Sequence, residues 1–381
     1  MDFELPQSHQ ILRKTVREFC QREVAPFAKE WDENEQFPSE LVPKLASLGL
    51  LGISIPEAYG GAGMDTLAYA LCVEECARVD GSLALTVASH NGLGVAHILH
   101  HGTEEQRKSY LPRAATGQWL AAWALTEPGV GSDGAGIQTL ARREGDEWIL
   151  NGTKTFISQG SVGAFCVVLA RTSYESTPHR GITAFIVDRD AAGFTVSKTL
   201  SKYGCRASDT AELVFQECRI SDEKRIGEVG MAFYDTMQIL DRGRISIAAM
   251  ALGLGRGAAA LALQYANDRQ TFGKPIAQHQ AIQWKIADAK TRLDAAELLI
   301  HRAAWLCDRE RPYSLEAATA KLFASEAATQ VCNDAMQVHG GYGYSREFEV
   351  ERFLRDVKLC EIGEGTSEIQ RLIIARHVIG R

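Results

Sequence analysis

The chain of 381 residues is 45% hydrophobic and 23% charged, which predicts two or three well-packed domains and argues against disorder. Its formal net charge of -7 disfavours a nucleic-acid partner, because binding nucleic acid requires a basic face. No run approaches the ~18 uninterrupted apolar residues of a membrane span and no signal peptide is visible, so we expect no membrane partner.

Nine cysteines are scattered along the chain without a repeating spacing, which favours reduced thiols over a disulfide framework. Cys72 and Cys76 are four residues apart in a predicted helix, without a second pair or a suitably spaced histidine. We therefore expect buried apolar thiols and no metal site. The expected location is the cytoplasm in a bacterium, or the mitochondrial matrix if a transit peptide has been removed.

Residues 1–120 are predicted to form an N-terminal helical domain. Their first helix should end or kink at Pro26, because proline cannot continue a helical hydrogen-bond ladder. Its apolar residues recur on one helical face: Leu12, Val16, Phe19, Cys20 and Val24. Further helices are predicted at 39–48, 66–80, 82–100 and 103–115.

Residues 121–230 are predicted to form a middle domain of short antiparallel strands, either a small barrel or a sandwich. Asn151-Gly152 is a strong two-residue hairpin signal between strands at 147–150 and 153–158. Further segments rich in β-branched and aromatic residues predict strands at 165–171, 182–188, 194–198 and 211–215.

Residues 231–381 are predicted to be helical again, with helices at 248–266, 282–309 and 314–338. The last helix should begin near Ser367, which forms a Ser-x-x-Gln capping box with Gln370. The order helical, β, helical excludes a doubly wound parallel sheet.

One glycine-rich run resembles a dinucleotide fingerprint. Gly253-x-Gly255-x-x-Ala258 has the spacing, but it lies inside a helical pattern instead of after a strand. We interpret these small residues as points of close contact between helices.

Three segments carry candidate chemistry. The first is Ala-Leu-Thr-Glu-Pro-Gly-Val-Gly-Ser-Asp at 124–133, a loop at the junction of the helical and β regions where the backbone can approach a flat ligand. An ordinary interdomain loop explains its composition equally well.

The second segment is Gln337-x-x-Gly340-Gly341-x-Gly343, which directly follows a predicted helix. Its glycines could wrap a phosphate or adenosine group through backbone amides, or they could simply cap the helix. The third is Gly363-Glu364-Gly365, in which two glycines can bend the chain and bring a carboxylate close to a ligand. A solvated loop carboxylate is the commoner occupant of such a position.

The first two segments resemble, position for position, the two signature segments of the acyl-CoA dehydrogenase family, and the likeness extends over essentially the whole chain. The resemblance implies an α+β multidomain fold with an N-terminal α-helical domain, a middle β-barrel and a C-terminal four-helix bundle. It also implies FAD as cofactor, an acyl-CoA substrate, an electron-transferring flavoprotein as partner, and a homotetramer built as a dimer of dimers.

The same resemblance assigns roles to individual residues. Glu364 matches the catalytic glutamate that removes the α-proton of the thioester while hydride passes from the β-carbon to flavin N5. Phe156 takes the place of a usual tryptophan that stacks on the flavin, so the indole N–H is lost. The implied flavin-binding residues are Leu125, Thr126, Ser132, Phe156, Ser158, Arg269, Phe272, Gln280, Gln337, Gly340, Gly341, Thr366 and Glu368. The implied substrate contacts are Ser132, Asp241, Arg244 and Gly365.

Two glycines bear on the reaction and the substrate. Some family members place the base at the position that holds Gly243 here, which leaves Glu364 as the candidate base. Gly363 stands where the family often has tyrosine, which widens the cavity beside the reacting carbons. We therefore expect a short straight or short branched acyl group. The helix at 82–94 carries no Arg or Lys to meet the distal carboxylate of a glutaryl group.

Three alternatives share this fold. An acyl-CoA oxidase would typically be a much longer chain, and a nitroalkane-oxidising flavoprotein generally has aspartate where this chain has Glu364. The third alternative is a non-catalytic FAD-binding scaffold, and an intact Glu364 together with both signature segments argues against it.

Overall fold

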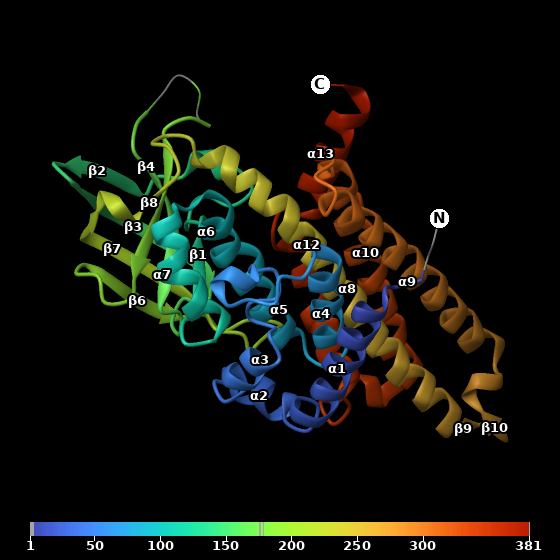
Figure 1. Ribbon diagram of the computed structural model, residues 1–381. Helices are drawn as coiled ribbons and strands as arrows, with labels where there is room; N and C mark the ends of the chain where they lie inside the picture. The colour runs from blue at the N-terminus through green and yellow to red at the C-terminus, as the bar shows by residue number, and fades with distance from the viewer. Residues whose placement is uncertain (1–3, 175–176, 178, 381) are drawn as a thin grey trace.

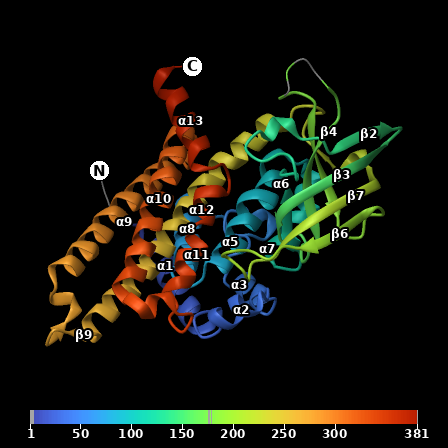
Figure 2. The ribbon, with the colours of Figure 1, turned by 180° about the vertical axis from the view of Figure 1, so that it is seen from behind.

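The computed structural model describes residues 4–174, 177 and 179–380, and it consists of a helical region, a β region and a second helical region in chain order (Figure 1). The predicted order of the three parts is therefore confirmed. The β region lies at one end of the molecule (Figure 1). The long helices α8 (Ala232–Asp268), α9 (Gln280–Cys307) and α10 (Ser314–His339) extend toward the other end (Figures 1 and 2).

The N-terminal region packs around two fully enclosed helices, α4 and α5, in which apolar residues occupy nearly every face. The stretch 82–100 is not one helix as predicted, because a π-helical turn at His90–Val95 separates α5 from α6. α1 ends at Glu23, before Pro26. The elements are α1 Gln7–Glu23, α2 Ala28–Asn34, α3 Leu41–Ser47, α4 Thr66–Ala77, α5 Gly81–Ser89, α6 Ala96–His101 and α7 Glu104–Ala115.

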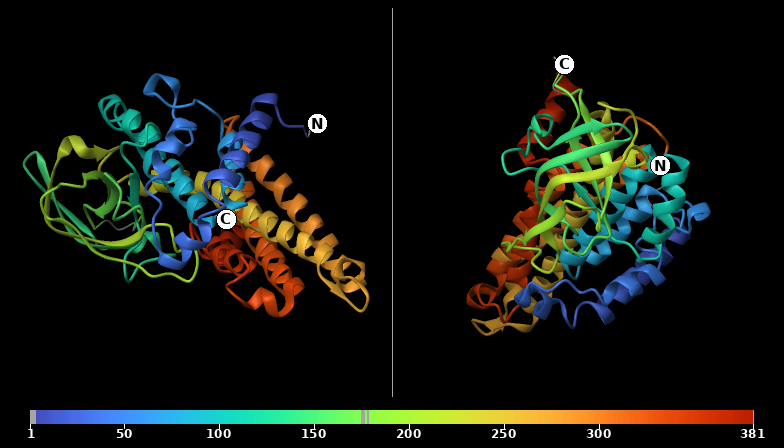
Figure 3. Two further views of the ribbon diagram at one scale, coloured as in Figure 1. Left: turned by 90° about the horizontal axis from the view of Figure 1, so that it is seen from below. Right: turned by 90° about the vertical axis from the view of Figure 1, so that its left-hand side faces the viewer.

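The middle region is one eight-stranded sheet in the order β6-β7-β3-β2-β4-β5-β8, with β1 paired parallel to β4. The sheet curls around an apolar cluster that includes Trp148, Phe185 and Phe215 (Figure 3). Its end strands β6 and β8 do not pair with each other, so the barrel is open at one edge. The strands are β1 Ala121–Ala124, β2 Leu140–Glu144, β3 Glu147–Ser158, β4 Phe165–Arg171, β5 Ile182–Asp188, β6 Phe194–Thr199, β7 Thr210–Ser221 and β8 Arg225–Ile226.

The hairpin predicted at Asn151-Gly152 is wrong. Both residues lie inside the continuous strand β3, at a register shift against β7. The Asn151 side chain exchanges two hydrogen bonds with Glu217 of β7, at 2.8 and 2.9 Å. A side chain at Gly152 would meet the Thr139 backbone, so glycine serves a close approach between strands instead of a turn.

The C-terminal region is built on α8, Ala232–Asp268, which begins 16 residues before the predicted start at 248. The last helix is capped by Thr366, whose side chain accepts from the Ile369 amide, and not by the predicted pair Ser367 and Gln370. The other elements are β9 Gln270–Thr271, β10 Lys274–Pro275, α9 Gln280–Cys307, α10 Ser314–His339, α11 Val350–Val357, α12 Leu359–Ile362 and α13 Ser367–Ile379.

α8 is a core helix. It is long and apolar enough to cross a membrane by length and composition, but 78% of its most apolar 18-residue window is buried inside the protein. A side chain added at Gly253 would collide with the Glu74 carbonyl of α4 at 2.2 Å, and one added at Gly255 would meet Leu293 of α9 at 2.7 Å. The interpretation of these glycines as helix contacts is therefore confirmed.

Candidate active site

Glu364 and Gly243 face each other across the junction between α12 and α8. A Cβ built on Gly243 would lie 1.7 Å from Glu364 Oε2, so the carboxylate occupies the space that any other residue would fill. Oε2 is buried and has no hydrogen-bond partner in the described structure. The two positions that the sequence singled out therefore share one space, which only one of them can fill with a side chain.

The surroundings of the Glu364 carboxyl group set its acidity. Burial raises the pKa of Glu364 to about 7, although the charges of Lys321 and Arg244 act in the opposite direction. A carboxyl group with this pKa is half ionised near neutral pH, where a general base is most effective.

The backbone that carries Glu364 is held in an unusual conformation. Glu364 itself has φ 52°, in the left-handed region that side chains other than glycine rarely adopt, and Gly365 has φ 93°. The Gly365 carbonyl accepts hydrogen bonds from Lys321 Nζ at 2.7 Å and from Gln370 Nε2 at 2.8 Å. Backbone in such a conformation persists only where surrounding contacts fix it.

Lys321 and Gln370 were not predicted as site residues. Lys321 lies on α10 and its side chain is completely buried. Of the predicted residues beside this turn, Thr366 caps α13 and is half-buried, whereas Glu368 is exposed in the first turn of α13.

Asp241 and Arg244 lie on α8 next to Gly243. They form an ion pair, and Asp241 Oδ1 also accepts from Ser314 Oγ at 3.0 Å. Arg244 is 5% exposed and its Nε has no partner in the described structure. Asp241 also lines a pocket of about 810 Å³ together with Arg242 and Arg311. Neither Gly243 nor Glu364 is among the residues that line this pocket.

The first signature segment packs directly against β3. The Thr155 amide donates to the Thr126 carbonyl at 3.0 Å, and Lys154 Nζ donates to the Leu125 carbonyl at 2.9 Å. Added side chains at the glycines of this loop, Gly129 and Gly131, would meet nothing within 4 Å, and Ser132 is exposed. The loop thus presents open backbone, as a flat ligand would require.

Phe156 stands out beside this loop. It lies at a register shift in β3, has φ 58° and is 67% exposed, although it is a large apolar residue. A bulky residue in the left-handed region is an outlier, and such strain gathers at ligand sites. The half-buried Ser158 follows two residues later on the same strand.

The other predicted flavin residues lie around the ends of α8 and α10. Arg269, Phe272, Gly340 and Gly341 line one open pocket of about 750 Å³. Phe272 is 95% exposed and has φ 51°. Gln280 and Gln337 flank the pocket, next to its lining residues Ala281 and Val338.

These residues fall into two groups at opposite ends of the molecule. The Phe156 group belongs to the sheet, whereas the Arg269 group lies at β9, beyond the far ends of the long helices (Figures 1 and 2). Each group offers an exposed aromatic ring in strained backbone beside open glycines, which fits one half of a long, flat, phosphate-bearing cofactor. The residues present therefore fit FAD, if each chain supplies half of a site.

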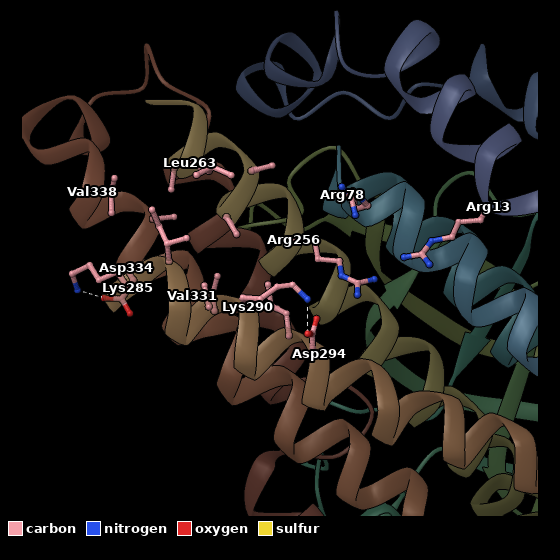
Figure 4. Close-up of a pocket in the computed structure, with 17 residues that line it drawn as sticks. Arg13, Arg78, Arg256, Leu263, Lys285, Lys290, Asp294, Val331, Asp334 and Val338 are labelled. Atoms are coloured by element: carbon pink, nitrogen blue, oxygen red, sulfur yellow. Dashed lines mark hydrogen bonds and ion pairs between the residues drawn. The ribbon is translucent and has the colours of Figure 1, made fainter. Parts of the chain in front are cut away.

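A further pocket, of about 390 Å³, lies between α8, α9 and α10 (Figure 4). Its cations are all engaged with carboxylates: Arg13, Arg78 and Arg256 with glutamates of α4, Lys285 with Asp334, and Lys290 with Asp294. Neither Glu364 nor any predicted flavin residue lines it. We therefore do not regard it as part of the active site.

Sequence comparison identifies the three regions. Family models of the acyl-CoA dehydrogenase N-terminal, middle and C-terminal domains match residues 6–118, 122–218 and 231–379. The chain is 44% identical over 376 residues to the mitochondrial short-chain specific acyl-CoA dehydrogenase of Homo sapiens, covering 99% of this chain and 91% of that protein.

Two solved structures agree with this. Butyryl-CoA dehydrogenase from Megasphaera elsdenii superposes with a TM-score of 0.97 at 39% identity, over 100% of both chains. A chain in a structure described as "Electron transferring flavoprotein of Acidaminococcus fermentans" superposes with a TM-score of 0.98 at 40% identity, again over 100% of both chains. The chain belongs to the acyl-CoA dehydrogenase family, whose members are FAD-dependent oxidoreductases that act on acyl-CoA thioesters.

Proposed function

We propose that this enzyme desaturates a short-chain acyl-CoA between its α- and β-carbons, with Glu364 as the base that removes the α-proton. The observation that carries the proposal is the half-buried Glu364, whose Oε2 is enclosed over Gly243 without a partner and whose pKa is raised to about 7 by burial. An enclosed carboxylate without a partner is suited to accept a proton from a bound ligand.

The thioester carbonyl needs stabilisation as the α-proton leaves, because negative charge develops on its oxygen. The Glu364 amide donates to no acceptor among the described residues. Its N–H is therefore free to donate to the thioester oxygen. The strained turn at Glu364 and Gly365 would present base and oxyanion donor from one residue.

Bound FAD supplies the redox chemistry, because its flavin ring accepts the hydride that leaves the β-carbon. The chain's contribution would be to position the ring: Leu125, Thr126, Ser132 and Ser158 would hold its edge, and Phe156 would stack on its face. Arg269, Phe272, Gln280, Gln337, Gly340 and Gly341 would bind the diphosphate and adenosine of a second subunit's cofactor. The separation of the two groups supports a homo-oligomer, and we propose the homotetramer of two dimers.

The CoA moiety would bind along α8. Asp241 lines the pocket of about 810 Å³ together with Arg242 and Arg311, whose guanidinium groups suit phosphate. Arg244 would not contact CoA. Its ion pair with Asp241 would instead hold the part of α8 that faces Glu364 in place.

Two features support a short acyl chain. A Cβ on Gly363 would contact only Leu359, at 3.4 Å or more, so space lies beside Glu364 where the family resemblance implies a tyrosine in other members. Deeper in the protein, the buried Tyr69 donates to the Ala88 carbonyl at 2.6 Å and fills the space above Gly92. Burial raises the pKa of Tyr69, and the nearby Glu364 carboxylate adds to this effect. We infer a cavity that is wide near the reacting carbons and closed a short distance beyond them.

A series of acyl-CoAs tests both the reaction and the chain length. Under anaerobic conditions butyryl-CoA should bleach the yellow holoenzyme, which should reoxidise slowly in air. Straight thioesters from C4 to C12, with isobutyryl- and isovaleryl-CoA, should give the highest kcat/KM at four or five carbons. We expect a fall of at least about tenfold by C12, because overpacking an enclosed cavity costs about 1–3 kcal/mol.

Each outcome has a separate meaning. Failure to bleach with any acyl-CoA would contradict the dehydrogenation, and fast reoxidation by oxygen would identify an oxidase instead. Bleaching with a maximum at C12 would leave the reaction in place and refute the short chain.

Gly243 provides a direct test of the space shared with the base. Gly243→Ala places a methyl group where Glu364 Oε2 lies, so the carboxylate must move while the backbone stays. We expect kcat to fall about tenfold to a hundredfold, because displacing a reacting group by ~1 Å has effects of that size. FAD content and melting temperature should remain those of the parent protein.

The matched control is Ala260→Val at an exposed position of the same helix, which should leave kcat unchanged. An unchanged kcat for Gly243→Ala would show that the carboxylate works from another position.

We further propose that electrons pass from the reduced enzyme to an electron-transferring flavoprotein, supported by the likeness to the Acidaminococcus fermentans chain.

A further inference from the structure

Lys321 is a charged side chain in a place where charge is costly. It lies on α10 with no exposed surface, between alanines that face the core. Burying an ammonium group is unfavourable unless hydrogen bonds and opposite charge compensate, so lysine is almost never fully buried. A leucine or methionine would fill the same volume at lower cost, which indicates that the amine itself has a role.

The contacts of Lys321 point to one structural element. Its Nζ donates to the Gly365 carbonyl at 2.7 Å, across 44 residues of sequence. That carbonyl follows directly on Glu364 and belongs to the left-handed turn that carries the base. Gln370 Nε2 donates to the same oxygen at 2.8 Å and approaches the Glu364 carbonyl at 3.4 Å. A neutral donor and a cationic donor therefore hold one carbonyl from two helices.

We propose, on the basis of the function proposed above, that Lys321 is a positioning residue: its ammonium group anchors the Gly365 carbonyl and so aims the Glu364 carboxylate over Gly243. The cation also has an electrostatic effect on the base. Of the charges that act on Glu364, Lys321 is the largest that favours the ionised form, followed by Arg244 from α8.

The other groups around this site define what remains if Lys321 is removed. Tyr69 from α4 and Cys360 from α12 are buried, and burial raises the pKa of both, so they are neutral near pH 7. Glu361 from α12 pairs with Lys358. Burial lowers the pKa of Lys321 to about 8, so it is mainly charged at neutral pH. Without it, Arg244 alone would favour the Glu364 carboxylate.

The pH dependence of kcat/KM separates this role from a purely structural one. Glu364 acts as a carboxylate, so kcat/KM of the parent enzyme should rise as pH increases through about 7. Lys321→Met removes both the anchor and the charge. We expect kcat at pH 7 to fall roughly tenfold to a hundredfold. The rise in kcat/KM should move to higher pH, so that part of the loss is recovered in alkaline buffer.

Two further variants separate the loss of the hydrogen bond to the Gly365 carbonyl from the loss of the positive charge. Gln370→Leu removes the neutral donor alone, so kcat should fall while the midpoint of the pH profile stays in place. Lys321→Gln keeps an N–H donor without charge, so its profile should shift as in Lys321→Met, and it serves if the methionine variant does not fold. Lys290→Met, at a surface lysine with 76% side-chain exposure, is the control and should change neither quantity.

The measurements are steady-state kcat and kcat/KM with butyryl-CoA from pH 5.5 to 9 (~1.5 units below and ~2 units above the parent midpoint) and FAD content by absorbance. A shifted profile in folded, FAD-loaded Lys321 variants supports the proposal. An unshifted profile with unchanged kcat overturns it, as does a uniform loss at every pH. A parent enzyme that does not oxidise butyryl-CoA at all would contradict the proposed function instead.

Discussion

Glu364→Gln should bind FAD and fold as the parent protein does, yet lose turnover by about 10³-fold or more. The amide has the shape of the carboxyl group but cannot accept the α-proton. Since Oε2 makes no hydrogen bond in the described structure, no structural contact is lost with it. The variant should also bind acyl-CoA, because the Glu364 backbone N–H remains. Anaerobic mixing with butyryl-CoA should therefore perturb the flavin spectrum without bleaching it.

The control for this variant is Glu326→Gln, which neutralises an exposed carboxylate that pairs with Arg371 on the surface. It should retain the parent kcat. Turnover by Glu364→Gln within about tenfold of the parent would remove Glu364 as the base. Loss of FAD would instead show that the substitution disturbs the fold. The role of Glu364 as the base would then be tested by the kcat of Gly243→Ala.

Lys154→Met should have the largest effect on stability. Lys154 is fully buried in β3, and its Nζ donates to Glu127 at 2.8 Å and to the Leu125 carbonyl at 2.9 Å. The variant leaves the Glu127 carboxylate buried without a cation, which costs about 3–5 kcal/mol in comparable pairs. It also releases the backbone of the first signature segment. We expect a lower melting temperature and lower FAD occupancy, measured by differential scanning fluorimetry and flavin absorbance.

An exposed ion pair in the same sheet is the control, because it shows how little an exposed pair contributes to stability. Lys198 of β6 and Glu212 of β7 lie 3.7 Å apart, with Lys198 58% exposed. Lys198→Met should change the free energy of unfolding by about 0–1 kcal/mol. Adding Glu127→Gln to Lys154→Met removes the buried negative charge that has lost its cation, and should recover part of the lost stability. A double variant no more stable than Lys154→Met would contradict this account.

The sequence was most informative where the structure depends on local residues. The helical, β and helical regions follow from periodicity, and Glu364 is flanked by glycines that permit its backbone turn. The hairpin prediction at Asn151-Gly152 was wrong for a physical reason. Asn-Gly favours a turn in isolation, but here pairing with β7 and the hydrogen bonds between the Asn151 side chain and Glu217 outweigh that local preference.

Residues that act through tertiary contacts were missed. A lysine on a long helix is usually exposed, but one feature of the sequence indicates that Lys321 is buried. It falls on the buried face of α10 with Ala317, Ala324 and Ala328, at the spacing that marks a core stripe. Lys154 gave no such signal, because its partner Glu127 lies in a loop 27 residues away. The contact between Gly243 of α8 and Glu364, in the turn after α12, joins residues far apart in the sequence, so no local pattern indicates it.

The division of the predicted flavin residues between opposite ends of the molecule also has a thermodynamic consequence. If a bound cofactor bridges two chains, cofactor binding and subunit association are coupled equilibria, and each strengthens the other. Apparent affinity for FAD then rises with protein concentration, and dilution releases flavin and subunits together. The measured stability of such a protein would therefore depend on the concentrations of both chain and FAD.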